Sequence, residues 1–89
     1  MISESSLERK CNKIAKEKGI LNYKLGQQGV PDRLYVGQDL VFFVEFKVKG
    51  AKPRLLQEVR IEELKSKNMK VFVVDELEQF IKILGGLTS

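Results

Sequence analysis

The sequence contains no histidine, no tryptophan and only one cysteine, Cys11. Disulfide frameworks and the usual cysteine and histidine zinc sites need several such residues, so both are excluded. Mechanisms that use imidazole as acid or base are excluded as well. Carboxylates, lysines and metal-bound water remain for any proton transfer.

Long hydrophobic runs are also missing. No apolar run approaches the roughly 20 residues that span a bilayer, and the start, Met1-Ile2-Ser3-Glu4, lacks the basic and apolar segments of a signal peptide. We therefore expect a cytoplasmic location without membrane association. With 89 residues, we expect one domain over 1–89, whose modest core favours association as a homodimer.

Positive charge is unevenly placed. The net charge is +4 and the pI about 9.3, and the segment 47–70 holds more lysine and arginine than acid: Lys47, Lys49, Lys52, Arg54, Arg60, Lys65, Lys67 and Lys70 against Glu58, Glu62 and Glu63. Such a surface suits a polyanion such as nucleic acid. Lysine-rich helices are also often plain solvated faces, so charge leaves both readings open.

Hydrophobic periodicity predicts an α/β fold in the order α-β-β-β-α-β-α. The first helix is expected over 6–18, with Ser5 as N-cap and Glu8 completing a capping box. A short strand over 20–25 and a glycine loop over 26–29 follow. Two strands over 33–36 and 40–48 form a hairpin, which we expect at the centre of a mixed sheet flanked by helices.

The second half of the chain predicts a crossover unit. A helix over 54–67 carries an apolar stripe of Leu56, Val59, Ile61 and Leu64, and Asn68 can end it in the left-handed conformation. The next strand, over 70–74, should then run parallel to the strand before the helix. A last helix is expected after a cap at Asp75 and before Gly85-Gly86.

Two short motifs place charges in this apolar setting: Gly29-Val30-Pro31-Asp32 and Val44-Glu45-Phe46-Lys47. Side chains alternate along extended chain, so Glu45 and Lys47 share one face of a strand. If Asp32 lies on a neighbouring strand or turn, the two carboxylates converge beside the ammonium, as a divalent-metal site requires.

Each motif also has a simpler interpretation. Asp32 can be a turn aspartate that hydrogen-bonds its own backbone, and Glu45 with Lys47 can be a solvent-facing pair on a half-exposed sheet. Val41 and Phe43 share the face of the pair, so an apolar face becomes charged at one end. That arrangement favours a cleft.

The order of motifs resembles the VRR-NUC branch of the PD-(D/E)XK nucleases over nearly the whole chain. The resemblance rests on a first helix with Glu8, the segment 29–32 followed by Arg33, a hydrophobic strand ending in E-F-K, and a loop from Lys49 leading to Gln57. It implies a restriction-endonuclease-like core. The site residues of the branch map onto Glu8, Asp32, Glu45, Lys47 and Gln57. One departure is the run Pro53-Arg54-Leu55-Leu56-Gln57, where the branch usually has serine-proline ahead of the glutamine.

The resemblance further implies a divalent metal, Mg²⁺ or Mn²⁺, with Asp32, Glu45 and Glu8 as ligands and the backbone carbonyl of Phe46 as an additional one. Three carboxylates in one pocket would raise one another's pKa unless a cation were bound. Metal-held water would attack the scissile phosphorus, while Lys47 lowers the pKa of that water or stabilises the developing charge. The products would carry 5′-phosphate.

Two of these residues keep alternatives. Glu8 can ligate the metal, cap its helix, or do neither. Gln57 shares a stripe with Ile61 and Leu64 and so points toward the sheet, where its amide needs a partner. That partner is either the metal site or a bound phosphate, or simply a strand end.

We expect contacts to the DNA backbone from Lys49, Lys52 and Arg54, with Arg33, Lys24 and Tyr23 in addition. The chain shows no recognition helix and no aromatic platform, so DNA shape rather than sequence should be recognised, without a small-molecule cofactor.

Stand-alone phage and bacterial members of the branch cleave branched DNA, including four-way junctions, as homodimers. By resemblance we expect the same here, with pairing through the C-terminal helix or the hydrophobic hairpin. A non-catalytic DNA-binding module with this fold is the alternative, and the intact set of acids and lysine argues against it. A sequence-specific restriction-type nuclease is disfavoured because the chain has no room for a recognition domain.

Overall fold

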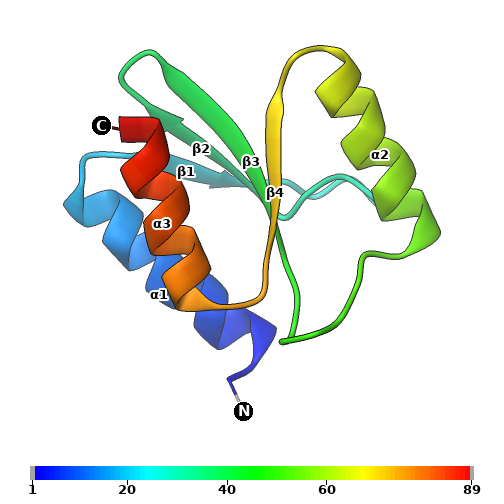
Figure 1. Ribbon diagram of the computed structural model, residues 1–89, viewed down its shortest axis with the longest axis horizontal. Coiled ribbons are helices and arrows are strands. Elements are labelled where there is room, and N and C mark those ends of the chain that lie inside the picture. Colours follow the sequence, from blue (N-terminus) through cyan, green and yellow to red (C-terminus); the bar gives the residue numbers. More distant parts are fainter. Residues whose placement is uncertain (1, 89) are drawn as a thin grey trace.

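Helices and strands follow the predicted order in the computed structural model, which describes residues 2–88 (Figure 1). The elements are α1 (Glu4–Glu17), β1 (Leu21–Lys24), β2 (Arg33–Gly37), β3 (Leu40–Phe46), α2 (Leu55–Ser66), β4 (Lys70–Val74) and α3 (Leu77–Thr88). The predicted α/β class is therefore confirmed. Asn68 ends the turn after α2 with a φ of 64°, in the left-handed region as expected.

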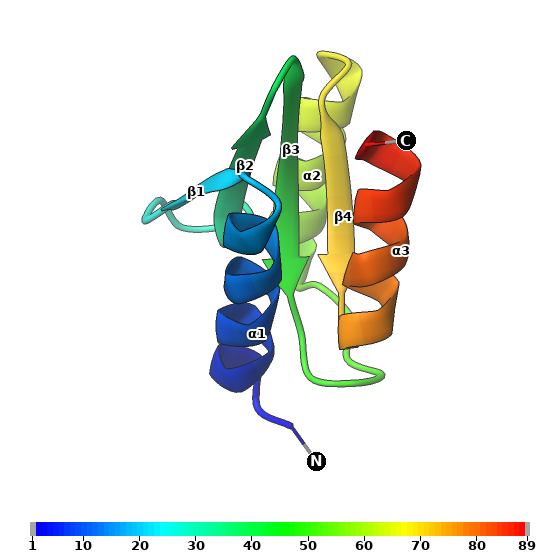
Figure 2. The same ribbon diagram turned by 90° about the vertical axis from the view of Figure 1, so that its left-hand side faces the viewer.

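The four strands form one mixed sheet in the order β1-β2-β3-β4. Strands β1, β2 and β3 pair antiparallel, whereas β4 pairs parallel with β3. The hairpin is central, and α2 is the crossover helix, both as predicted. Helices α1 and α3 lie on one face of the sheet and α2 lies on the other (Figure 2).

The main core lies between the sheet and the pair α1 and α3. Alternate residues of β3 point into it, and its aromatic centre is Tyr35 stacked on Phe42, with ring centroids 5.1 Å apart. The fully buried apolar residues are Leu7, Cys11, Ala15, Tyr35, Phe42, Val44, Phe46, Val74, Phe80 and Leu84. The face of β3 with Glu45 and Lys47 is turned away from this core.

Helix α1 begins two residues earlier than predicted. Ser3, not Ser5, is the N-cap, and its hydroxyl accepts from the backbone N–H of Ser6. The predicted capping box of Ser5 and Glu8 is wrong, because Ser5 already lies inside the first turn. The Glu8 carboxylate is consequently free for a partner on the sheet.

Helix α2 is more exposed than its apolar stripe predicted. Only Ile61 is buried, while Leu56 and Val59 are 41% and 45% exposed. The physical reason is that α2 packs on β4 at the edge of the sheet, so only a narrow strip of the helix meets other residues.

Helix α3 differs at both ends from the prediction. The side chain of Asp75 accepts from the N–H of Gly50, and no cap by this carboxylate is seen within the described residues. The helix also runs through both glycines to Thr88, because Leu84 is buried in the core and Leu87 packs against it.

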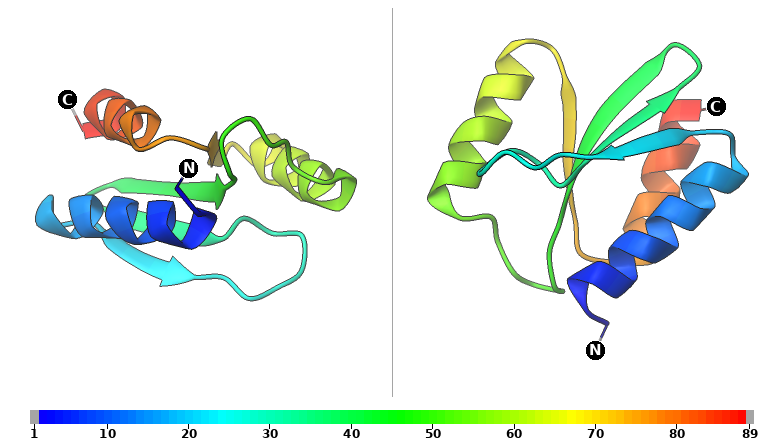
Figure 3. Two further views of the ribbon diagram at one scale, coloured as in Figure 1. Left: turned by 90° about the horizontal axis from the view of Figure 1, so that it is seen from below. Right: turned by 180° about the vertical axis from the view of Figure 1, so that it is seen from behind.

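The sheet face on the α2 side is largely apolar beyond the reach of that helix. Leu21, Tyr23 and Val41 alternate with inward-facing residues and are 58%, 54% and 44% exposed. Figure 3 shows from below that α1 and α2 lie on opposite sides of the sheet.

Within the part of the chain described, no helix combines the length and the apolar character needed to cross a membrane.

Candidate metal centre

Asp32 lies directly before β2 and is anchored to β3. Its Oδ2 accepts from the backbone N–H of Phe46 over 2.8 Å. Pairing between β2 and β3 begins at Arg33 opposite Val44, so Phe46 lies beyond the end of β2 and the Asp32 carboxylate takes the place of a strand partner. The structure thus bonds this carboxylate to the neighbouring strand rather than to its own turn.

Glu45 is the buried acid of this site and is only 2% exposed. Its Oε2 accepts from Gln57 Nε2 over 2.8 Å and lies 3.3 Å from Lys47 Nζ. Its other oxygen, Oε1, is buried without a hydrogen-bond partner among residues 2–88. A buried carboxylate oxygen left unpaired is costly, and a cation would satisfy it.

The electrostatics of Glu45 point in the same direction. Burial, followed by the negative charge of Asp32, raises the pKa of Glu45 to about 7, although Lys47 lowers it in part. A carboxylate that ionises with such difficulty gains from a bound cation. The oxygen donors of Asp32 and Glu45 suit Mg²⁺ or Mn²⁺, so the residues present fit the metal that the resemblance implies.

Gln57 and Lys47 hold the carboxylate from two sides. Gln57 Oε1 accepts from the backbone N–H of Arg54 over 2.9 Å, which orients the amide so that Nε2 donates to Glu45. Lys47 is 12% exposed and lies two residues after Glu45, just beyond the end of β3, which stops at Phe46 and not at residue 48 as predicted. The structure brings Asp32, Glu45, Lys47 and Gln57 together, as predicted. The alternative, in which the Gln57 amide bonds only the end of a strand, does not account for its hydrogen bond to the Glu45 carboxylate.

Glu8 has a different partner. Its Oε2 accepts from Arg33 Nε over 2.5 Å, and Arg33 also donates to Asn22 Oδ1 over 3.1 Å. Among residues 2–88, no three acidic or cysteine side chains lie close enough to hold one metal ion. In this conformation, Glu8 therefore does not join Asp32 and Glu45, and its role as a ligand stays a prediction.

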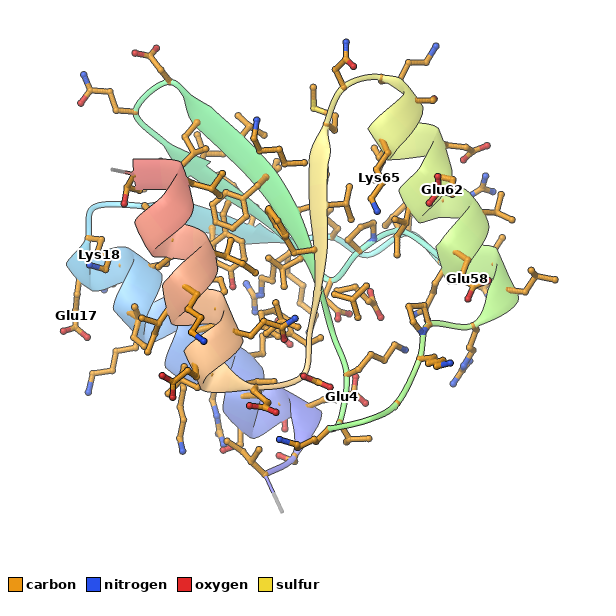
Figure 4. The ribbon with its side chains drawn as sticks, in the orientation of Figure 1. Glu4, Glu17, Lys18, Glu58, Glu62 and Lys65 are labelled. Carbon is orange, nitrogen blue, oxygen red and sulfur yellow. The ribbon has the colours of Figure 1, made fainter. Side chains whose placement is uncertain are left out.

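Glu4 was missed by the sequence reasoning. Its charge contributes to the raised pKa of Glu45 as the smallest of the causes, and it lies in the first turn of α1, where Figure 4 labels it. The signal was available, since Glu4 and Glu8 are four residues apart and share a helix face. The predicted start of the helix at residue 6 concealed it.

The predicted DNA contacts are spread over two regions. Lys52 and Arg54 are exposed in the loop before α2, and Lys24 and Tyr23 are exposed on β1. Lys49 is exposed but pairs with Glu76, which raises the pKa of Lys49. These contacts stay predictions. Figure 4 shows Glu58, Glu62 and Lys65 along one exposed side of α2, where two acids are followed by a base.

No protein-family model and no curated protein matches this sequence. Among solved structures, one described as a VRR_NUC domain superposes with a TM-score of 0.85 at 28% sequence identity, over 92% of this chain and 94% of that one. By fold, this chain is similar to a VRR-NUC domain. The resemblance stated from the motifs is thereby supported by the arrangement of the whole chain.

The VRR-NUC fold explains why the four central residues meet. Strand β3 supplies Glu45, and Lys47 directly follows its last residue. The turn before β2 supplies Asp32, and the first turn of α2 supplies Gln57. In Figure 1 these segments gather at the end of the sheet where β3 leads into the loop before α2. The mixed sheet and its crossover helix thus bring together residues 25 positions apart in the sequence.

Proposed function

We propose that this VRR-NUC domain is a divalent-metal-dependent DNA endonuclease. The observation that carries the proposal is the buried Oε1 of Glu45, which has no hydrogen-bond partner among residues 2–88 and lies next to Asp32 and Lys47. A domain that only binds DNA gains nothing from two acids beside phosphate, which repels them. If the domain were a non-catalytic DNA-binding module, the pair of acids at this site would have no explanation.

The residues of the chain divide the work in this proposal. Asp32, Glu45 and the carbonyl of Phe46 would hold Mg²⁺ or Mn²⁺, which supplies Lewis-acid activation of water and neutralises charge at the phosphate. Lys47 donates from Nζ to the charge that develops during cleavage. Gln57 keeps the Glu45 carboxylate in a single orientation, and the Phe46 N–H does the same for Asp32.

The DNA would be held through its backbone by the exposed residues Lys52 and Arg54, with Lys24 and Tyr23 farther along the surface. Such contacts position a duplex without reading its sequence. We therefore propose that the domain recognises its DNA by shape and that its substrates include branched DNA such as four-way junctions.

A symmetric junction needs two cuts, and we propose that a homodimer makes them. Of the two candidate interfaces, the hairpin is favoured, because Leu21, Tyr23 and Val41 are exposed on the same face of the sheet, on the two strands that flank β2. Val41→Arg should then shift the protein to monomer in light scattering, whereas Ile81→Arg on α3, where Ile81 is similarly exposed at 46%, should not. The reverse result would move the interface to α3.

The function itself is tested by incubating the protein with a four-way junction, a linear duplex and a single strand, with Mg²⁺, Mn²⁺ or EDTA. We expect metal-dependent cleavage with a preference for the junction. Binding of DNA without cleavage of any substrate would support the binding module instead, and sequence-specific cuts in linear duplex would contradict recognition by shape.

A further inference from the structure

The loop between β1 and β2 approaches helix α2 closely at Gly29. Gly29 has a φ of +84°, and a Cβ added there would lie 2.7 Å from Cγ and 3.0 Å from Cδ2 of Leu56. Real Cβ atoms do not approach other carbons this closely. Leu56 thus occupies the space that any other residue at position 29 would need.

This contact closes a ring around the candidate metal centre. Leu56 precedes Gln57, whose amide donates to Glu45, and Phe46, the residue after Glu45, donates its N–H to Asp32. Asp32 ends the same loop that contains Gly29. The Leu56 contact, with a looser approach by Arg60 Cγ at 3.3 Å from the added Cβ, joins the loop to α2. Hydrogen bonds join α2 to β3 and β3 to the loop.

The first turn of α2 has few other attachments. Its other residues apart from Gln57 are exposed, with Leu55 at 76%, and the one buried residue of the helix, Ile61, lies a turn later. The loop and this turn face each other across a cavity of about 130 Å³, lined by Gln28, Gly29, Arg54, Leu56 and Gln57. Leu56 is 41% exposed, so it contributes little to the core.

We propose that Leu56 is a positioning residue, which packs against the backbone of Gly29 and thereby holds Gln57 on Glu45. The consequence for catalysis rests on the proposed nuclease function. The positioning itself does not, because the Gln57 contact exists in the metal-free protein and can be observed there.

The test compares Leu56→Ala with Leu55→Ala, which removes the same atoms from the adjacent leucine that does not face the loop. In NMR spectra of the metal-free proteins, we expect cross-peaks between the Gln57 side-chain amide and Glu45 to vanish in Leu56→Ala, to persist in Leu55→Ala and to return in Leu56→Met. With metal and DNA, kcat should fall about 10-fold in Leu56→Ala alone, with KM little changed. Retention of the Gln57 cross-peaks in Leu56→Ala would overturn the proposal, even if the wild type proved to have no nuclease activity.

A double-mutant cycle tests the contact with Gly29 independently. Gly50 has the same φ of +84° but open space where a Cβ would be, so Gly50→Ala measures backbone strain alone. We expect Gly29→Ala to lower the free energy of unfolding more than Gly50→Ala does, and most of this excess to disappear in the Leu56→Ala background, where only the looser approach to Arg60 Cγ remains. An excess that is the same in both backgrounds would show that Leu56 and position 29 are not coupled, which overturns the proposal.

Discussion

Gln57 Nε2 donates a hydrogen bond to Glu45 Oε2 over 2.8 Å, across the gap between helix α2 and strand β3. The bond occupies one oxygen of the carboxylate and leaves Oε1 buried without a partner in the described part of the chain. A side chain that satisfies only half of a buried carboxylate orients it for a second ligand. The relationship explains why a glutamine at the start of a mostly exposed helix belongs to the site.

Gln57→Leu should make Glu45 harder to ionise. Removing a donor to the charged form raises the pKa of Glu45 above its value of about 7. Because ionised Glu45 is needed to hold the metal, the acidic limb of the pH–rate profile should move to higher pH, with kcat at neutral pH lowered about 10-fold. Gln79→Leu, which alters a glutamine on α3 that bonds Asp75 and Val73, is the control and should leave the profile in place.

Lys47 and Lys49 should behave differently although they are two residues apart. Lys47 is 12% exposed and lies 3.3 Å from Glu45, whereas Lys49 is 67% exposed and pairs with Glu76. Lys47→Ala should lower kcat about 10²- to 10³-fold, while Lys49→Ala should at most weaken DNA binding. Single-turnover cleavage, with protein in excess of DNA and at concentrations above the Kd, measures the difference. Equal losses in the two variants would show that Lys47 has no catalytic role.

Glu45 should make the metal-free protein less stable as the pH rises. The pKa of Glu45 is about 7 in the folded protein against 4.5 for an ordinary glutamate, so the folded state binds the proton more tightly between these pH values. The favourable contribution is complete below about pH 4.5 and is lost as the pH rises through about 7. Glu45→Gln should therefore gain roughly 1–3 kcal/mol over wild type between pH 5 and pH 8.

Urea unfolding in EDTA at the two pH values measures this gain. Added Mn²⁺ should stabilise the wild type at pH 8 much more than Glu45→Gln, because the metal binds the ionised carboxylate. A difference in stability between the two proteins that does not change with pH would contradict the raised pKa.

Glu8 should act mainly through Arg33. Glu8→Gln should lower the free energy of unfolding by about 1 kcal/mol, and this effect should shrink in the Arg33→Gln background, because the bond between the two side chains is already lost. Calorimetric titration with Mn²⁺ provides the contrast. If Glu8→Gln caused a large loss of Mn²⁺ affinity both in the wild type and in the Arg33→Gln background, this result would show that Glu8 is a metal ligand.

Much of the fold could be predicted because its signals are local. The apolar run of β3 and the crossover helix before β4 specify a parallel pair, and the short turn at Gly37 to Asp39 specifies the hairpin. The start of α1 could not be predicted, because Ser3, Ser5 and Ser6 have nearly equal capping chemistry and only the finished helix selects Ser3.

The exposure of α2 could not be predicted for a related reason. The spacing of Leu56, Val59 and Ile61 indicates an amphipathic helix, but the sequence does not say that the helix lies at the edge of the sheet beside β4. Only the tertiary structure shows that Leu56 meets the loop at Gly29 instead of the core.

The centre of the site was predictable, whereas its surroundings were not. Alternation along β3 places Glu45 beside Lys47, and a turn before β2 brings Asp32 to the same end of the sheet. The partner of Glu8 depends on how α1 lies over β2, since Arg33 follows Asp32 and extended chain turns it to the opposite face. That arrangement is a long-range property, and no local pattern contains it.

The most direct test of the account is the rate of DNA cleavage by wild type and Asp32→Asn, each with Mn²⁺ and with EDTA. The asparagine keeps an oxygen that can accept from the Phe46 N–H, but it removes the charge that would hold the metal. We predict cleavage by the wild type only with Mn²⁺, and a loss of about 10²- to 10³-fold in Asp32→Asn with an unchanged unfolding temperature. Cleavage by the wild type in EDTA, or by Asp32→Asn at the wild-type rate, would contradict a metal-dependent nuclease centred on Asp32 and Glu45.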